Sequence, residues 1–275
     1  MVDPIAVTQR LRARERRPFH GRNGGLRRIL LEWRGIRIYS YSVMLYLGLT
    51  FGIVAGDYAA HLAALPSARV LVAMILLTVP GLLGARLLFV AIHWTVYRRE
   101  PRRIWRGSEG GAAVLGGLVL AVAVSPPLLS AVELPFGAFW DVATFAMLIW
   151  LIFGRLGCVL HGCCGGRPSA GPFALELPDH RGVWRRRIPT QLLEAGWALI
   201  LLIAAVGLWK HSPFPGALFL TVVAAYGGGR FALQGAREQQ DRLGMLNIQQ
   251  VICTGLLALS FIGLLVLWLD GTWPA

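Results

Sequence analysis

Long apolar stretches alternate along this chain with short polar segments that are rich in arginine. The hydrocarbon core of a bilayer is roughly 30 Å thick, so an α-helix needs about 20 apolar residues to cross it. Seven stretches have this character, and they predict an all-α, polytopic membrane protein with about seven transmembrane helices around a lipid-binding cavity. The stretches cover about 39–60, 69–94, 112–132, 136–153, 191–209, 214–234 and 247–269.

Composition agrees with a membrane protein. Of 275 residues, 56% are hydrophobic and only 15% are charged, whereas soluble domains carry ~25% charged residues. Residues 1–37 are polar and Arg-rich, without the apolar core of a cleavable signal peptide. We therefore divide the chain into a basic N-terminal segment at 1–37 and a transmembrane domain at 38–275.

The formal net charge of +13 raises the question of a nucleic-acid partner. The arginines flank apolar stretches, and no nucleic-acid-binding motif accompanies them. Arginines in such positions meet anionic lipid head groups. The charge therefore predicts contact with anionic lipids and no binding of nucleic acid.

The arginines also predict an orientation. Ten lie within residues 1–38, and five more lie in the segment YRREPRRIWRGSEGG that follows the second stretch. The loops on the other side are mainly acidic and hold only Arg69 and Lys210 as basic residues. The positive-inside rule then places the N-terminus and the Arg-rich loops in the cytoplasm and the C-terminus outside.

Charged residues inside membrane spans are costly and mark candidate functional sites. Arg86 lies within the second stretch, Arg155 at the end of the fourth, and Glu194 near the start of the fifth.

The sixth stretch carries the clearest pattern. Tyr226, Arg230 and Gln234 follow one another at intervals of four residues and therefore share one helix face. The three glycines at 227–229 would each cost about 1 kcal/mol relative to alanine in a soluble helix. They indicate a close helix contact or a cavity wall that brings Arg230 toward a ligand. The alternative is an arginine whose side chain extends to the membrane interface.

Two arginines close to a membrane interface suit the phosphate of a lipid head group. The guanidinium group offers a planar fork of donors that matches phosphate oxygens. Arg155 lies in the glycine-rich stretch FGRLGCVLHGCCGGRPSAG at 153–171, where exposed backbone N–H groups can add to an anion site. Arg155 and Arg230 are therefore predicted to hold one phosphate.

The same stretch contains a cysteine cluster. Cys158, His161, Cys163 and Cys164 could supply four zinc ligands. The C-x₄-C-C spacing lacks the usual C-x₂-C pair, however, and adjacent cysteines rarely bind one ion. A thiol-redox role is a further alternative. We favour small residues that pack in a tight turn presenting Arg155, and we expect no metal and no cofactor.

The motifs GRLGCVLHGCCGGR, RIPTQLLEA and YGGGRFALQGARE resemble signature regions of the prolipoprotein diacylglyceryl transferase family. The segments GGAAVLGGLV and YSYSVMLYLGL extend this resemblance over roughly residues 38–268. The resemblance implies a metal-independent enzyme of the bacterial inner (plasma) membrane. Its donor is phosphatidylglycerol, its acceptor is the lipobox cysteine that follows the signal peptide of a prolipoprotein, and glycerol phosphate leaves.

The resemblance and the polar pattern together predict the site residues. The expected catalytic residues are Arg155, Arg230, Tyr226 and His161. The residues expected to bind substrate are Tyr41, Arg86, Gly116, Gly117, Gly154, Gly157, Gln191, Glu194 and Gln234.

The chain also departs from the family pattern. Leu115 stands where the family has a histidine, so His161 becomes the candidate base. The resemblance also implies asparagine, glutamate or histidine at five further positions. This chain has Cys158, His161, Cys163, Ile188 and Gln234 there instead.

These departures leave two alternatives to the transferase. One is a lipid-binding relative that has lost the chemistry. The other is a transferase with a cytoplasmic acceptor, because the family reaction takes place outside whereas the charge rule puts the matching end inside.

Overall fold

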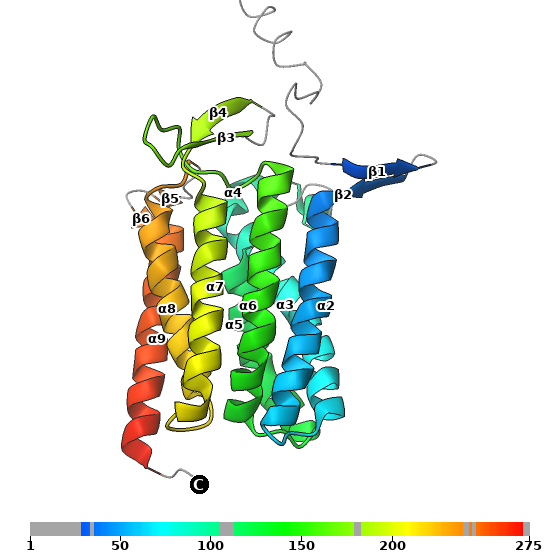
Figure 1. The fold of residues 1–275 in the computed structure, drawn as a ribbon, viewed down its shortest axis with the longest axis vertical. Coiled ribbons are helices and arrows are strands. Elements are labelled where there is room, and N and C mark those ends of the chain that lie inside the picture. Colours follow the sequence, from blue (N-terminus) through cyan, green and yellow to red (C-terminus); the bar gives the residue numbers. More distant parts are fainter. Residues whose placement is uncertain are drawn as a thin grey trace, which may run out of the picture.

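The computed structural model describes residues 29–33, 36–98, 100–104, 113–178, 183–238, 242–243 and 246–271. Most of the basic segment at 1–37 therefore lies outside the described residues. Seven long helices run side by side in one bundle (Figure 1). They are α2 (Ser40–Leu62), α3 (Ser67–Ile92), α5 (Val114–Ala131), α6 (Phe136–His161), α7 (Thr190–Leu208), α8 (Ala217–Gln234) and α9 (Ile248–Asp270).

The seven helices confirm the all-α prediction. Six of them are long and apolar enough to cross a membrane, so the chain is a multi-pass membrane protein. The remaining helix, α8, contains the three glycines, Arg230 and Gln234, and it packs against α6, α7 and α9. One predicted boundary was wrong: α6 continues to His161 rather than ending near 153. Arg155 therefore lies inside the helix and not in a turn.

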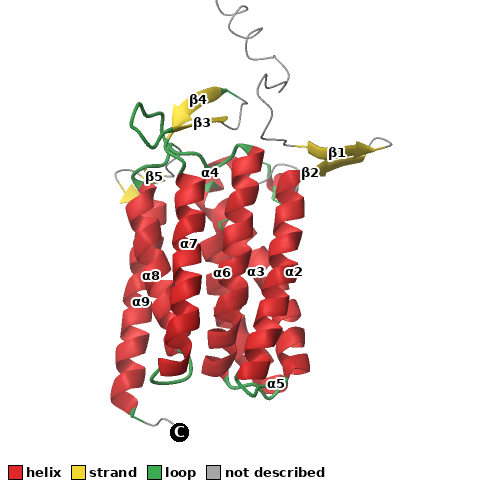
Figure 2. Ribbon diagram, in the orientation of Figure 1, coloured by secondary structure: helices red, strands yellow, loops and turns green. Residues whose placement is uncertain are grey.

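Short elements gather at one end of the bundle (Figure 2). Three antiparallel hairpins lie there: β1 (Ile29–Trp33) with β2 (Ile36–Tyr39), β3 (Leu175–Pro178) with β4 (Trp184–Arg187), and β5 (Arg242–Leu243) with β6 (Leu246–Asn247). The helical turns α4 (Trp94–Tyr97) and η1 (Pro101–Arg103) follow α3 at the same end. The turn η3 (Trp209–His211) and the end of α9 lie at the opposite end. We call the end that carries the hairpins the site end. Helices α6 and α8 end there and α7 begins there, so the predicted site residues near these helix ends lie at this end.

Glycines bring neighbouring helices into close contact. A Cβ atom on Gly52 of α2 would lie 2.8 Å from the carbonyl oxygen of Ala146 in α6. Gly84 of α3 and Gly116 of α5 face each other, and a Cβ on either would lie within 2.5 Å of the other's carbonyl oxygen. Small residues at such crossings let helix backbones pack closely in a membrane.

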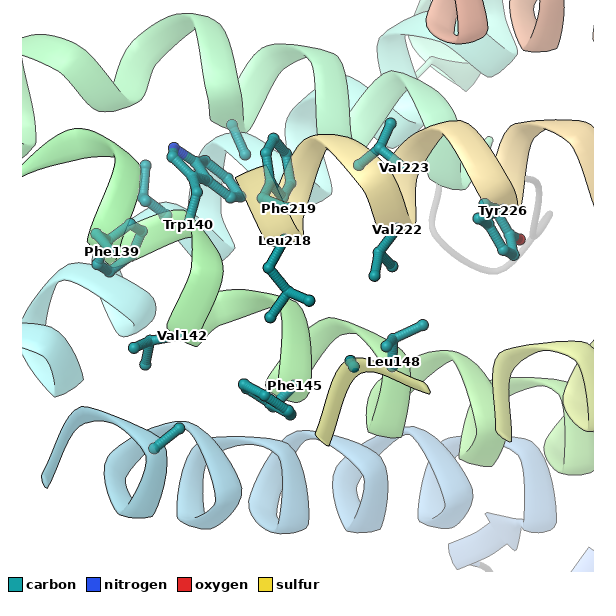
Figure 3. Close-up of a cluster of buried hydrophobic side chains, with 14 of the residues drawn as sticks. Phe139, Trp140, Val142, Phe145, Leu148, Leu218, Phe219, Val222, Val223 and Tyr226 are labelled. Atoms are coloured by element: carbon teal, nitrogen blue, oxygen red, sulfur yellow. The ribbon is translucent and has the colours of Figure 1, made fainter. Parts of the chain in front are cut away.

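The core between α6 and α8 is aromatic and aliphatic (Figure 3). The rings of Trp140 on α6 and Phe219 on α8 lie 4.8 Å apart between centroids. Trp140 Nε1 also donates a hydrogen bond of 3.0 Å to Ser125 Oγ of α5. The polar tip of this buried tryptophan is thereby satisfied, so α5, α6 and α8 share one packed core.

A buried carboxylate fastens the start of α8 to α6. Asp141 Oδ2 accepts a hydrogen bond of 2.7 Å from Gly216 N, and its Oδ1 accepts one of 2.9 Å from Phe219 N. The first N–H groups of a helix have no partner within the helix and carry partial positive charge. Asp141 satisfies two of them, and α8 is therefore held to α6 at the end opposite the site.

One glycine of the run at 227–229 makes a close helix contact, as the sequence predicted. Trp197 Nε1 of α7 donates a hydrogen bond of 3.1 Å to the carbonyl oxygen of Ala225. A Cβ on Gly229 would lie 2.2 Å from that same nitrogen, whereas a Cβ on Gly228 would meet nothing within 4 Å. Gly229 is thus the position at which α8 admits the indole ring.

We expect Gly229→Ala to lower the melting temperature in detergent, because the indole must move and lose its hydrogen bond to Ala225. Gly228→Ala is the matched control, and it should leave the melting temperature unchanged or raise it, since alanine favours helix by up to about 1 kcal/mol. Equal melting temperatures for the two variants would contradict the assigned contact.

Candidate functional site

Three arginines surround one glutamate at the site end of the bundle. Glu194, in the second turn of α7, lies 2.6 Å through Oε2 from Arg155 Nε of α6. Its Oε1 lies 2.8 Å from Arg230 Nη1 of α8 and 3.0 Å from Arg237 Nη2, just beyond α8. The Glu194 side chain is 1% exposed and the arginine side chains 6–12%. We call these four residues the Glu194 cluster.

The cluster carries unequal charge. Three guanidinium groups and one carboxylate sum to a formal charge of +2 within a buried site. Buried charges need a partner, because their loss of hydration costs several kcal/mol per ion. Arg237 Nε donates to Glu194 Oε1 at 3.2 Å, and the buried Nη2, which is ion-paired to the same oxygen at 3.0 Å, makes no well-directed hydrogen bond within the described part of the chain. The cluster is therefore suited to receive an anion.

The predicted polar face of α8 is buried as a unit. Tyr226, Arg230 and Gln234 are 7%, 6% and 1% exposed. Gln234 Nε2 lies 3.4 Å from Asn247 Oδ1, and the same oxygen caps α9 by accepting a hydrogen bond from Gln249 N. The end of α8 is thereby tied to the start of α9 beside the Glu194 cluster.

The first turn of α7 holds the segment that follows α6. Gln191 Nε2 donates a hydrogen bond of 2.8 Å to the carbonyl oxygen of Cys163, and Thr190 Oγ1 donates one of 3.1 Å to that of Cys164. Glu194 follows three residues after Gln191 on the same helix. One helix therefore positions both the cysteine segment and the Glu194 cluster.

The cysteine segment begins where α6 ends at Gly162, which has a left-handed φ of 77°. The sulfur atoms of Cys158, Cys163 and Cys164 all lie within 4.8 Å of one another. Hydrogen bonds from the thiols of Cys158 and Cys163, together with the positive fields of Arg237 and Arg155, lower the pKa of Cys164 well below its ordinary value, against the effect of burial. The segment thus provides a thiol of raised acidity close to the arginines.

His161 of α6 and Tyr41 of α2 are neighbours where these two helices meet. Their ring centroids are 5.9 Å apart, and a Cβ on Gly157 would lie 3.2 Å from the Tyr41 ring. Gly154 also faces α2, where a Cβ would lie 3.7 Å from Leu45. The two glycines beside Arg155 therefore accommodate α2 against α6.

Other predicted residues lie on the α3–α5 pair. Arg86 Nε donates a hydrogen bond of 2.8 Å to the carbonyl oxygen of Ile104, and its guanidinium lies 5.5 Å from the ring centre of Tyr97. Gly116 and Gly117 contact the backbones of Gly84 and Gly81. The structure thus places these three residues in packing contacts and not among the ion pairs of Glu194.

Sequence reasoning missed Arg237, Arg187 and Glu238. Arg237 follows Arg230 by seven residues, the spacing of two helical turns, but it lies beyond the end of α8, where that spacing is not a safe guide. Arg187 of β4 is 1% exposed and forms an ion pair with Glu238. No sequence pattern predicts that pair, because hairpin β3–β4 and the segment after α8 meet only in the folded chain.

We expect Glu194→Gln to destabilise the protein by roughly 3–5 kcal/mol, since it leaves three buried arginines without their counter-charge. Thermal unfolding in detergent measures the loss, and Glu176→Gln on the exposed part of hairpin β3–β4 is the control. A variant as stable as the wild type would contradict the role assigned to Glu194.

The chain is similar to known proteins along most of its length. The family model for prolipoprotein diacylglyceryl transferase matches residues 28–268. A phosphatidylglycerol–prolipoprotein diacylglyceryl transferase of Bacillus cereus is 29% identical over 251 residues, which cover 88% of this chain and 92% of the relative. One of the same name from Bacillus anthracis is 28% identical with the same coverage. The chain belongs to the prolipoprotein diacylglyceryl transferase family.

Proposed function

We propose that this protein transfers the diacylglyceryl group of phosphatidylglycerol to the thiol of a lipobox cysteine in a prolipoprotein, with release of glycerol phosphate. The names of its relatives support this reaction. The structural observation that carries the proposal is the excess positive charge of the buried Glu194 cluster. The protein would act in the bacterial inner membrane, where it meets anionic lipids and signal peptides.

The charge of the cluster fits the course of this reaction. The phosphodiester of the donor carries one negative charge, and a second develops on the glycerol phosphate as it departs. A site with a formal charge of +2 binds the developing dianion better than the bound monoanion, which is what lowers a barrier. Glu194 holds Arg155, Arg230 and Arg237 in place before the lipid arrives, so little reorganisation is needed.

The acceptor must react as a thiolate, because the thiolate is the nucleophile. Its sulfur attacks the glycerol carbon that bears the phosphate, the carbon–oxygen bond breaks, and the electron pair remains on the phosphate oxygen. His161 is the proposed acceptor of the thiol proton, since Leu115 offers no base. Tyr226, one turn before Arg230, is proposed to contact the same phosphate.

The remaining predicted residues are proposed to line or support the path of the lipid. Tyr41, Gly154 and Gly157 lie where α2 meets α6, and Gln191 and Gln234 flank the Glu194 cluster. Arg86, Gly116 and Gly117 are proposed to support this path without touching the lipid, because the glycines pack α5 against α3 and Arg86 is bonded to Ile104. A purely lipid-binding relative is the less favoured alternative, because the relatives named above are transferases.

Arg230→Lys tests the phosphate assignment. Lysine keeps the charge but cannot offer the planar fork of donors. We expect glycerol phosphate release with phosphatidylglycerol and a lipobox peptide to fall about 10- to 100-fold, the loss of a charge-assisted hydrogen bond of roughly 1.5–3 kcal/mol. Arg69→Lys, in an exposed ion pair with Glu133 at the opposite end, is the control.

Unchanged activity in Arg230→Lys would contradict the assignment of Arg230 to the phosphate. Binding of phosphatidylglycerol by the wild type without any release would favour the lipid-binding alternative, and release without lipidation of the peptide would favour a different acceptor.

One specific observation favours a second candidate, a transferase with a cytoplasmic acceptor: among the described residues, the Arg-rich elements η1 (Pro101–Arg103) and β4 (Trp184–Arg187) lie at the site end. Lys210 distinguishes the two, because it is the only lysine in the sequence and lies exposed at the opposite end. Transfer to translocated prolipoproteins requires the site end outside, so an amine reagent that cannot cross membranes should leave Lys210 unmodified in spheroplasts and modify it after lysis. Modification before lysis would instead favour the cytoplasmic acceptor.

A further inference from the structure

Three thiols converge beside the Glu194 cluster, and the proposed reaction uses none of them. The sulfur atoms of Cys158, Cys163 and Cys164 lie within 4.8 Å of one another, and none of the three is in a disulfide. The fourth cysteine of the chain, Cys253, lies separately and buried in α9. Thiols this close to one another can be joined by oxidation, so the cysteine segment is a candidate site of reversible modification.

We propose that a small peroxide oxidises Cys164 and Cys158 to a disulfide, and that this bond lowers transfer of lipid until a thiol reductant breaks it. The second half of this proposal rests on the transferase function proposed above. Transfer to translocated prolipoproteins requires the site end outside. Disulfides form and persist in oxidising environments such as the bacterial periplasm.

The end of α6 brings the thiols together. Gly162 N donates to the carbonyl oxygens of Cys158 and Val159, and Cys163 N donates to that of Cys158 at 3.1 Å. With the left-handed φ of 77° at Gly162, these bonds form a Schellman motif. In this motif the residue just past the glycine frequently contacts a side chain of the last helical turn. Here these two residues are Cys163 and Cys158, and Cys164 follows directly.

Cys164 is the thiol that reacts first. Its pKa is lowered by hydrogen bonds from the thiols of Cys158 and Cys163 and by the positive fields of Arg237 and Arg155, and the thiolate is the form that attacks. Cys164 is also partly exposed, whereas Cys158 is buried. Oxidation of cysteine follows thiolate character and exposure, so a peroxide reacts with Cys164 and leaves Cys158 as the second thiol.

The oxidation proceeds in two steps. The Cys164 thiolate attacks one oxygen of hydrogen peroxide, the oxygen–oxygen bond breaks, and hydroxide leaves with the electron pair, so that Cys164 becomes a sulfenic acid. The Cys158 sulfur then attacks the Cys164 sulfur, and the thiol proton and the sulfenic hydroxyl leave as water. Two thiols are oxidised and one peroxide is reduced.

Cys158 is a better partner than the adjacent Cys163. Neighbouring Cα atoms lie about 3.8 Å apart across a trans peptide, whereas a disulfide usually joins residues whose Cα atoms are about 4.4–6.8 Å apart. A bond between Cys163 and Cys164 would therefore strain the chain. Cys158, six residues before Cys164, is free of this restriction.

The segment after Cys164 connects the thiols to Arg237. Backbone hydrogen bonds of 3.3 and 2.9 Å join residues 165–167 to both neighbours of Arg237. Formation of a disulfide requires the two sulfur atoms to approach to about 2.05 Å, which draws Cys164 toward α6. The shift acts through residues 165–167 on Arg237, whose Nη2 lies 3.0 Å from Glu194 Oε1. Oxidation thereby disturbs one of the three arginines that hold the anion.

The modification can be measured without any lipid. We would treat the reduced, purified protein with hydrogen peroxide, block the remaining thiols and cleave after arginine, which releases all three cysteines in one peptide, 156–167. Mass spectrometry should find a Cys158–Cys164 disulfide in the wild type and in the controls Cys253→Ser and Cys163→Ser, and no disulfide in Cys158→Ser. A wild type that keeps three thiols, or a disulfide between Cys163 and Cys164, would overturn the proposal.

Lipid transfer to a lipobox peptide, measured after the peroxide has been removed, tests the effect on activity. We expect transfer to fall about 10-fold in the wild type and in Cys253→Ser, as for the loss of one charge-assisted hydrogen bond, and to recover with dithiothreitol. Cys164→Ser should show no effect of peroxide. Unchanged transfer by the oxidised wild type would overturn the regulatory role. If the disulfide forms but the reduced protein transfers no lipid, the transferase function fails while the modification site stands.

Discussion

The burial of one carboxylate among three arginines is the interaction on which this structure depends. Charges at membrane depth are costly unless they are paired, and Glu194 pairs with arginines from two other helices. The ends of α6, α7 and α8 must therefore meet at one level, because any shift along the helix axes would separate buried charges. The same requirement that fixes the register of the helices assembles the candidate anion site.

A second buried carboxylate complements this constraint from the opposite end. Asp141 holds the first turn of α8 to α6, while Glu194 holds Arg230 near the last turn of α8. The helix fastened in this way carries three glycines and an arginine and is the long helix that falls short of the criteria for a membrane span. The polar contacts at both ends of α8 compensate for its lower hydropathy. They also hold Arg230 beside Glu194.

The sequence predicts the helices well, because the thickness of the bilayer imposes a length that any apolar stretch must meet. It also predicts the buried face of Tyr226, Arg230 and Gln234, since a helix repeats at fixed intervals. The pairing of Arg155 with Glu194 could not be predicted, because it depends on how α6 packs beside α7.

Arg237 and the cysteines show the same limit more sharply. Arg237 lies just beyond the end of α8, where helical spacing ceases to be a safe guide. The thiols of Cys163 and Cys164 lie close together although Cys164 has a left-handed backbone with a φ of 60°. The spacing of the cysteines along the chain does not predict this arrangement. Gly116 and Gly117 show the converse: a paired-glycine motif that suggests a ligand site is also explained by close packing of α3 against α5.

Leu115 stands where the resemblance implies a histidine in the family, and this bears on where titratable groups lie. Leu115 is 5% exposed and belongs to the hydrophobic core, so the start of α5 contributes packing and no titratable group. The charged and thiol groups described above come instead from α6, α7, α8 and the segments that follow α6 and α8. The cysteine segment is held by the first turn of α7, one turn before Glu194, so a single helix positions both that segment and the Glu194 cluster.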